Sequence, residues 1–217
     1  KNQLINQNDL LKVCQIPNPS EAFEYQCHYE AFVRTSVFKE LGLNQSKFRP
    51  ESVEGPNCAP TTNDTSYRHR IVQGQVQDPN AYAMGGIAGH AGLFANLKDT
   101  STFAMQYLKS LKGVGKQYLN QTTTSLFIKE YNHTQSSRAL GWNTNDPTVV
   151  DMGWGCSCGT LAPTTWMHLG YTGTMICGDP TRRIALVMLT NRVYPNENDI
   201  KIRAARKAVG KALQKAL

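Results

Sequence analysis

The chain has 217 residues, of which 40% are hydrophobic and 18% are charged, a composition typical of a globular protein. This length can bury a substantial core, and the composition excludes an intrinsically disordered chain. No run of eighteen apolar residues is present, so we expect no membrane-spanning helix. Lys1 is neither a start methionine nor part of an apolar signal region, so we interpret it as a processed or trimmed end.

The net charge of +7 is unevenly distributed. Residues 197–217 carry six basic side chains against Glu197 and Asp199, and these six could together bind an anionic partner: Lys201, Arg203, Arg206, Lys207, Lys211 and Lys215. The alternative is a solvated helix face, with cations placed favourably near the helix C-terminus. No aromatic residues lie among these charges, which disfavours nucleic-acid binding.

The six cysteines do not form a Cys-x-x-Cys pair, and no His or Cys pair accompanies Cys156 and Cys158. The sequence therefore predicts no metal site and no cofactor. An even number of cysteines permits disulfides, and four Asn-x-Ser/Thr sequons are present, so a secreted protein remains possible alongside a mitochondrial one.

In the first half of the chain, helical spacing of apolar residues predicts a helix over about 28–41, ended by Gly42. A long segment rich in Pro, Asn, Thr and Gly follows over about 48–80, with one short strand expected at 67–72. A helix capped by Asp99 or Thr100 is expected to reach Lys112.

In the second half, a helix is predicted over 121–131 and antiparallel strands over 166–171, 174–177 and 183–190. The last strand is almost wholly apolar, which indicates cover on both faces. A final helix capped by Asn196 or Asn198 should carry an apolar stripe of Ile202, Ala205, Val209 and Leu213. Helices followed by an antiparallel sheet and a flanking helix predict an α+β fold.

Several blocks together resemble the C-terminal half of the serine β-lactamase, penicillin-binding protein and esterase family. They are GGIAGHAGLF at 85–94, ALGW at 139–142, HLGYTGT at 168–174 and LTNRVYP at 189–195. The resemblance implies a partial β-lactamase/transpeptidase-like fold in one domain. Its parts would be a helix with long loops over 1–80, a helical region over 81–164, and strands with a C-terminal helix over 165–217.

The resemblance also implies a chemistry. In that family a serine of a Ser-x-x-Lys motif forms an acyl-enzyme, a lysine and a tyrosine handle its proton, and a Lys/His-Thr-Gly strand lines the pocket. The candidate remnants of this pocket are Tyr25, His168, Gly170 and Tyr171, with the Tyr171 N–H as one oxyanion donor. The sequence does not assign a catalytic role to any one of them.

Three departures from the family pattern bear on activity. Leu169 stands where threonine is usual, and Cys27 stands in the third position of the tyrosine motif. The literal Ser-x-x-Lys at Ser36–Lys39 follows the tyrosine motif instead of preceding it, so we interpret it as a chance match. His90 is expected to be structural.

Two main hypotheses follow. In the first, the chain is a shortened, non-catalytic structural or interaction subunit, and a protein partner covers the sheet left open around Val187. In the second, it is the C-terminal part of an active serine hydrolase whose nucleophile half is missing from or separate to this sequence. A third hypothesis is an anion-binding module that uses the basic C-terminal helix.

Overall fold

The computed structural model describes residues 21–50, 55–146 and 157–217, with side chains from Cys27 onward. The chain divides into two compact units. Unit 1 runs to Asp99 and includes 194–196, and unit 2 comprises Thr100–Val193 with Glu197–Leu217. The prediction of a single domain stays a prediction. No helix in the described part of the chain is long and apolar enough to cross a membrane.

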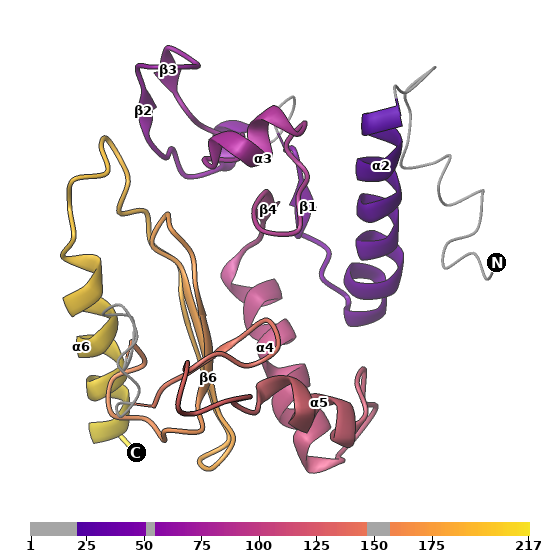
Figure 1. Ribbon diagram of the computed structural model, residues 1–217, viewed down its shortest axis with the longest axis vertical. Coiled ribbons are helices and arrows are strands. Elements are labelled where there is room, and N and C mark those ends of the chain that lie inside the picture. Colours follow the sequence, from indigo (N-terminus) through magenta and orange to yellow (C-terminus); the bar gives the residue numbers. More distant parts are fainter. Residues whose placement is uncertain (1–20, 51–54, 147–156) are drawn as a thin grey trace. The chain divides into compact units, whose positions relative to one another are not determined.

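Unit 1 begins with helix α2 (Glu21–Val33), which continues into a short π-helix, η1 (Arg34–Lys39) (Figure 1). The predicted helix therefore exists but starts earlier than expected. It ends where the sequence indicates, because Gly42 adopts a positive φ of 67° and the Leu43 N–H donates to the Phe38 carbonyl.

The long segment after this helix forms more structure than the single expected strand. Strand β1 (Lys47–Phe48) pairs antiparallel with β4 (Leu93–Phe94), and β2 (Asn63–Asp64) pairs with β3 (Arg70–Ile71). A 3₁₀ turn, η2 (Gly55–Asn57), and a short helix, α3 (Pro79–Ala83), complete it. The Asp78 carboxylate caps α3 by accepting a hydrogen bond from the Ala81 N–H.

An almost fully buried ion pair holds the β2–β3 hairpin. The Arg68 guanidinium donates to the Asp64 carboxylate at 2.7 Å and also to the carbonyls of Val76 and Gln77. Arg68 lies over the Tyr82 ring as well, 4.7 Å from its centroid. These side-chain bonds tie the hairpin to the segment that follows it and satisfy two backbone carbonyls there.

Unit 2 is built on a four-stranded antiparallel sheet in the order β5-β6-β7-β8. Strands β6 (Trp166–Leu169), β7 (Met175–Asp179) and β8 (Ile184–Met188) confirm the three predicted strands with shifted ends, whereas β5 (Asn143–Thr144) was not predicted. The Asp179 carboxylate accepts hydrogen bonds from the Thr181 and Arg182 N–H groups, which forms the expected turn.

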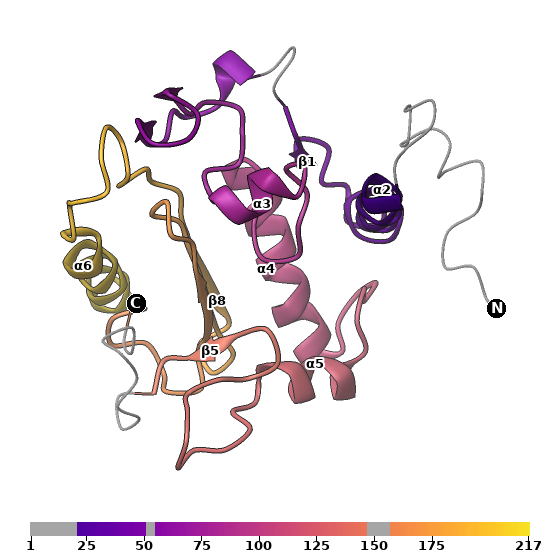
Figure 2. The same cartoon turned by 45° about the horizontal axis from the view of Figure 1, so that its top comes forward.

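Helices cover both faces of this sheet (Figures 1 and 2). Helix α4 (Leu97–Lys112) and helix α5 (Gln121–Ile128) lie on one face, and α6 (Ile202–Lys215) lies on the other. Between the sheet and α4, Trp166 is fully buried against Trp142 and Tyr107, at centroid distances of 4.5 Å and 5.2 Å. The prediction of an α+β fold is confirmed.

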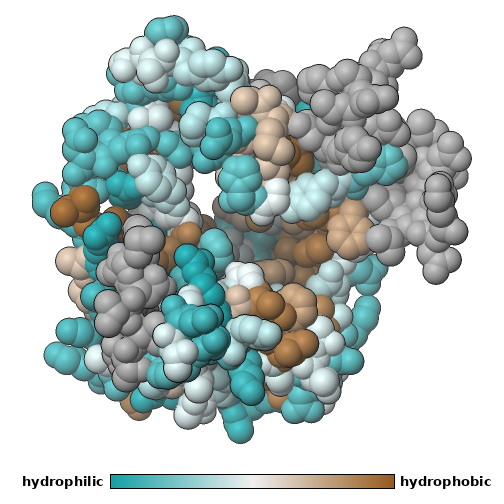
Figure 3. Space-filling model, viewed as in Figure 1, coloured by the Kyte–Doolittle hydropathy of each residue, from teal (hydrophilic) through white to brown (hydrophobic). Residues whose placement is uncertain are grey.

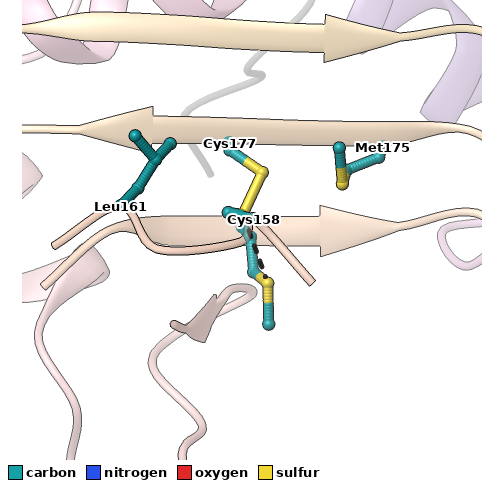
Figure 4. Close-up of a cluster of buried hydrophobic side chains, with 5 residues drawn as sticks. Cys158, Leu161, Met175 and Cys177 are labelled. Atoms are coloured by element: carbon teal, nitrogen blue, oxygen red, sulfur yellow. Dashed lines mark hydrogen bonds between the residues drawn. A yellow bond between two sulfur atoms is a disulfide. The ribbon is translucent and has the colours of Figure 1, made fainter. Parts of the chain in front are cut away.

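On the α6 side, a disulfide joins Cys158 to Cys177 of β7 within a buried cluster that includes Leu161 and Met175 (Figure 4). Helix α6 packs so closely against this segment that a Cβ on Gly210 would collide with the Cys158 carbonyl oxygen. Glycine in mid-helix costs about 1 kcal/mol relative to alanine, and here close packing explains its presence.

Helix α6 corrects two predictions. It starts at Ile202, beyond both predicted caps. Its most buried positions are Arg206 and Gly210, neither of which belongs to the predicted apolar stripe. Val209 of that stripe is 38% exposed. Arg206 is only 2% exposed and is the most buried of the six basic side chains considered as an anion-binding group, and that role of the group stays a prediction.

Candidate functional site

The candidate site lies at the far end of strand β6. Strand β5 pairs only with Trp166 and Met167, so the next two residues, His168 and Leu169, extend beyond it. The chain then turns sharply, with the Gly170 N–H donating to the Thr174 carbonyl at 2.9 Å. A Cβ on Gly170 would collide with the Thr174 hydroxyl, so a larger residue there would force the Thr174 side chain to move.

A buried arginine of helix α6 holds this turn in place. Arg206 of α6 donates through one Nη2 atom to the carbonyls of both Gly170 and Thr174, each at 2.8 Å. The Nε of Arg206 is buried and has no hydrogen-bond partner among the described residues. Burial, and secondarily the charge of Arg192, lower the pKa of Arg206, although an arginine remains protonated at any physiological pH.

Arg192 holds the outer side of the turn. Its Nε donates to the Tyr171 carbonyl at 2.9 Å, and its guanidinium lies 4.3 Å from the centroid of the Tyr171 ring. The Tyr171 hydroxyl donates to the Glu197 carboxylate at 2.7 Å, which raises the pKa of the phenol. Tyr171 is therefore held as a neutral phenol and is not poised to act as a base.

These elements surround a cavity of about 240 Å³. No carboxylate is among the residues that line the cavity. The charged side chains that line it are four arginines: Arg138, Arg192, Arg203 and Arg206. The volume falls below the roughly 300–1,000 Å³ of complete small-molecule sites. An anionic group such as a carboxylate fits this chemistry, because guanidinium groups bind carboxylates with paired hydrogen bonds.

His168 also lines the cavity, beside Arg138 and Asn143. Burial of its ring, followed by the positive charge of Arg138, lowers the pKa of His168 below its ordinary 6.5. The imidazole is therefore neutral at pH 7, where it can donate one hydrogen bond and accept another.

The predicted pocket residues are partly brought together. His168, Gly170 and Tyr171 all line the cavity, whereas Tyr25 lies in α2 of unit 1, where the structure does not describe its side chain. Leu169 lines the cavity and packs against the cluster around the disulfide. The catalytic roles of these residues stay predictions.

Two further residues of the sequence analysis lie in unit 1. Ser36 and Lys39 fall within η1 and at its end, in a helical segment. His90 lies 3.1 Å from the Asp78 carboxylate that caps α3, an arrangement that agrees with a structural role.

The sequence indicated Arg203 and Arg206 as possible anion-binding side chains of the C-terminal helix, but not that they line one cavity with Arg138 and Arg192. Arg138, Arg192 and Arg203 come from three separate segments, and no spacing pattern relates them. The available signal was the arginine in LTNRVYP, whose block was recognised only as a fold marker. The sequence also did not indicate that three side chains able to ligate a metal lie together: Glu130, His133 and Asp146.

Comparison with known proteins agrees with this architecture. The Beta-lactamase family model matches residues 25–211. A protein of Escherichia coli strain K12 named "Putative D-alanyl-D-alanine carboxypeptidase" is 32% identical over 180 residues, which cover 76% of this chain and 40% of the relative. A protein of the same name from Salmonella enteritidis is 30% identical over 178 residues, with the same coverage. The chain thus spans less than half the length of these relatives.

Two solved structures share the fold. Simvastatin synthase (LovD) from Aspergillus terreus gives a TM-score of 0.58 at 13% identity, over 89% of this chain and 50% of that one. A β-lactamase from Mycobacterium bovis gives a TM-score of 0.54 at 13% identity, over 90% and 62%. At such low identity these likenesses concern the fold alone. Because the family model covers most of the chain, the resemblance seen in the sequence motifs is confirmed, and the chain belongs to the β-lactamase family.

Proposed function

We propose that this chain forms the substrate-binding wall of a serine acyl hydrolase whose substrate carries a carboxylate near the scissile acyl group. The observation that carries the proposal is the cavity at the end of β6, where four arginines face the turn after His168. The relatives named for D-alanyl-D-alanine carboxypeptidase would act on a peptide with such a terminal carboxylate. The nucleophile would come from a polypeptide segment that this sequence does not contain.

Strand β8 supports the idea that such a segment packs here. It is the outer strand of the sheet, and all five of its residues are half-buried. Its side chains contact the clusters on both faces of the sheet, yet none is fully covered. An outer strand of apolar residues offers its edge to a further strand, which a segment carrying the nucleophile would supply.

The chemistry of the wall follows from its charges. Carboxylate binding by the arginines would hold the substrate, and the neutral His168 imidazole could hydrogen-bond the reacting group. The serine would form an ester with the acyl group as the leaving group departs with a proton, and water would then hydrolyse that ester. The Tyr171 N–H remains the proposed oxyanion donor within this chain.

A second candidate function is the non-catalytic subunit. Leu169 favours it, because its side chain packs toward the buried disulfide cluster where the family has a threonine hydroxyl. The exposed apolar side chains around α4 and α5 also suit an interaction role (Figure 3). Among them, Leu126 is 59% exposed and Phe127 is 40% exposed.

Labelling of native material separates the two candidates. A fluorophosphonate or penicillin probe should label a Ser-x-x-Lys peptide in the same polypeptide or complex if the wall serves a hydrolase. The alternative outcome is that no peptide is labelled and that the native mass equals this chain alone or this chain with an unreactive partner. That outcome would support the non-catalytic subunit and reject the hydrolase.

Ligand binding tests the wall itself. Acetyl-D-alanyl-D-alanine binding to the chain should weaken at least about tenfold in Arg203→Met, since a hydrogen bond to a charged group contributes roughly 1.5–3 kcal/mol. Lys211→Met on the same helix, outside the cavity, is the matched control and should bind as the unaltered chain does. Equal binding by both variants would reject the arginine wall.

A further inference from the structure

A group of metal-ligating side chains lies in unit 2 and is used by none of the chemistry above. Glu130, His133 and Asp146 each offer one ligand atom, and these atoms all lie within 4.8 Å of one another. The His133 Nδ1 is 3.1 Å from Glu130 Oε1 and 3.7 Å from Asp146 Oδ2. The two carboxylates are only 15% and 17% exposed, whereas the imidazole is 59% exposed.

The segment after α5 holds the first two of these side chains. The Tyr131 N–H donates to the Arg138 carbonyl, which closes the loop between them. Within the loop, the Asn132 side-chain oxygen accepts hydrogen bonds from the N–H and hydroxyl of Thr134, and its carbonyl accepts from the Gln135 N–H. The backbone around His133 is therefore set by its own hydrogen bonds.

The backbone next to the third side chain is held by hydrogen bonds of Asn145. Asp146 follows Asn145, whose buried amide donates to the carbonyls of Gly159 and Leu161. The Asn145 N–H also donates to the Thr165 carbonyl at 2.8 Å. Two independently fixed segments thus present their carboxylates to one imidazole, an arrangement that needs little reorganisation to bind an ion.

We propose that Glu130, His133 and Asp146 bind a Zn²⁺ ion. One imidazole and two carboxylates are a donor set that Zn²⁺ accepts, with water in the fourth position. Zn–N and Zn–O bonds of about 2.0 Å place tetrahedral ligands about 3.3 Å apart. The two separations from His133, 3.1 Å and 3.7 Å, bracket that value, and the separation between the two carboxylate oxygens is at most 4.8 Å, so binding would draw the ligands together.

The ion would fasten the loop after α5 to strand β5. The same loop carries Arg138, and β5 carries Asn143, two residues that line the cavity and are joined by a β-bridge. Zn²⁺ binding would therefore steady one side of the cavity without contacting a ligand in it.

The experiment measures Zn²⁺ affinity of the full chain after removal of metal with a chelator. Calorimetry or competition with a fluorescent zinc indicator should give a single tight site in the unaltered chain. His133→Ala and Glu130→Gln should each weaken Zn²⁺ binding at least about tenfold. His90→Ala is the matched control, because His90 also pairs with one carboxylate, at 3.1 Å from Asp78, and it should leave the affinity unchanged.

Thermal unfolding gives an independent readout. At equal Zn²⁺ concentration the unfolding temperature should rise in the unaltered chain and in His90→Ala and should rise less in Glu130→Gln, since a ligand stabilises the folded state more when it binds more tightly. The proposal is overturned if the unaltered chain binds no Zn²⁺ at micromolar free concentrations. It is also overturned if His133→Ala and Glu130→Gln bind as tightly as the control, which would leave the three side chains as an ion-pair cluster only.

Discussion

The two units of the chain are held together in different ways. Unit 2 buries large apolar side chains on both faces of a sheet, among them Trp166, Met167 and Met175. In unit 1, most of the fully buried hydrophobic side chains are smaller ones, such as Ala31, Val72 and Ala81. Unit 1 relies more on buried polar contacts, including Asp99, which accepts hydrogen bonds from the Gln45 N–H and the Ser46 hydroxyl.

The difference shows where sequence change is best tolerated. A core of interlocking aromatic rings loses contacts at many positions when one ring is removed, whereas a polar clamp fails at the few residues that form it. Unit 2, which carries the cavity, should therefore respond to volume changes, and unit 1 should respond to charge and pH.

The largest effect is expected for Trp166→Ala. Removing a fully buried indole from the Trp142 and Tyr107 contacts should lower the free energy of unfolding by roughly 3–5 kcal/mol. Chemical denaturation of the full chain measures the change. Ile71→Ala, at a side chain 48% exposed in unit 1, is the control and should shift the midpoint very little. A small effect of Trp166→Ala would contradict the assigned role of the aromatic cluster.

Loss of the disulfide should come next. The bond between Cys158 and Cys177 closes a loop of 19 residues, and constraint of the unfolded chain by such a loop contributes about 3 kcal/mol. Cys177→Ser should therefore unfold at lower denaturant concentration than the oxidised chain. If the fully reduced chain and the oxidised chain unfold at the same midpoint, the disulfide does not stabilise unit 2.

In unit 1, Asp64→Asn should cost up to about 3 kcal/mol, because it leaves the buried Arg68 guanidinium without its counter-ion. Amide exchange at the β2–β3 hairpin should accelerate while exchange at β7 stays slow. Arg70→Gln, which removes a charge from the exposed β3 strand, is the control. Equal acceleration in both units would contradict the division of the chain into separately stabilised parts.

A smaller effect is expected from acid. The hydrogen bond from Arg68 holds the pKa of Asp64 well below its usual 3.8, and in unit 2 hydrogen bonds from Arg182 lower the pKa of Asp179 despite its burial. Each carboxylate thus adds stability that is present above pH 3.8 and is lost as pH falls through its folded-state value. Unfolding midpoints measured from pH 5 to pH 2 should fall less steeply in Asp64→Asn than in the unaltered chain.

Much of the fold could be predicted from the sequence. Periodic apolar residues indicated α4, α5 and the three long strands, and Asp179-Pro180 indicated the turn between β7 and β8. Strand β5 was missed because two residues cannot show an alternating pattern. Part of the site was also found, since HLGYTGT placed His168, Gly170 and Tyr171 at one strand end.

The rest of the site depends on tertiary contacts. The sequence groups Arg206 with the other basic side chains of α6, either as an anion-binding group or as a solvated face, because a charged side chain on a basic helix is usually exposed. Its burial follows from two carbonyls, of Gly170 and Thr174, that turn toward α6 and need donors. No local pattern reveals that need, and the same holds for Glu130 and Asp146, which meet only through folding.

The bond from Arg206 to the Thr174 carbonyl spans 32 residues of chain. The turn that shapes the cavity therefore depends on a helix that lies later in the chain than both strands it joins. The β6–β7 hairpin can form from local contacts, but the binding wall is complete only when α6 packs against it.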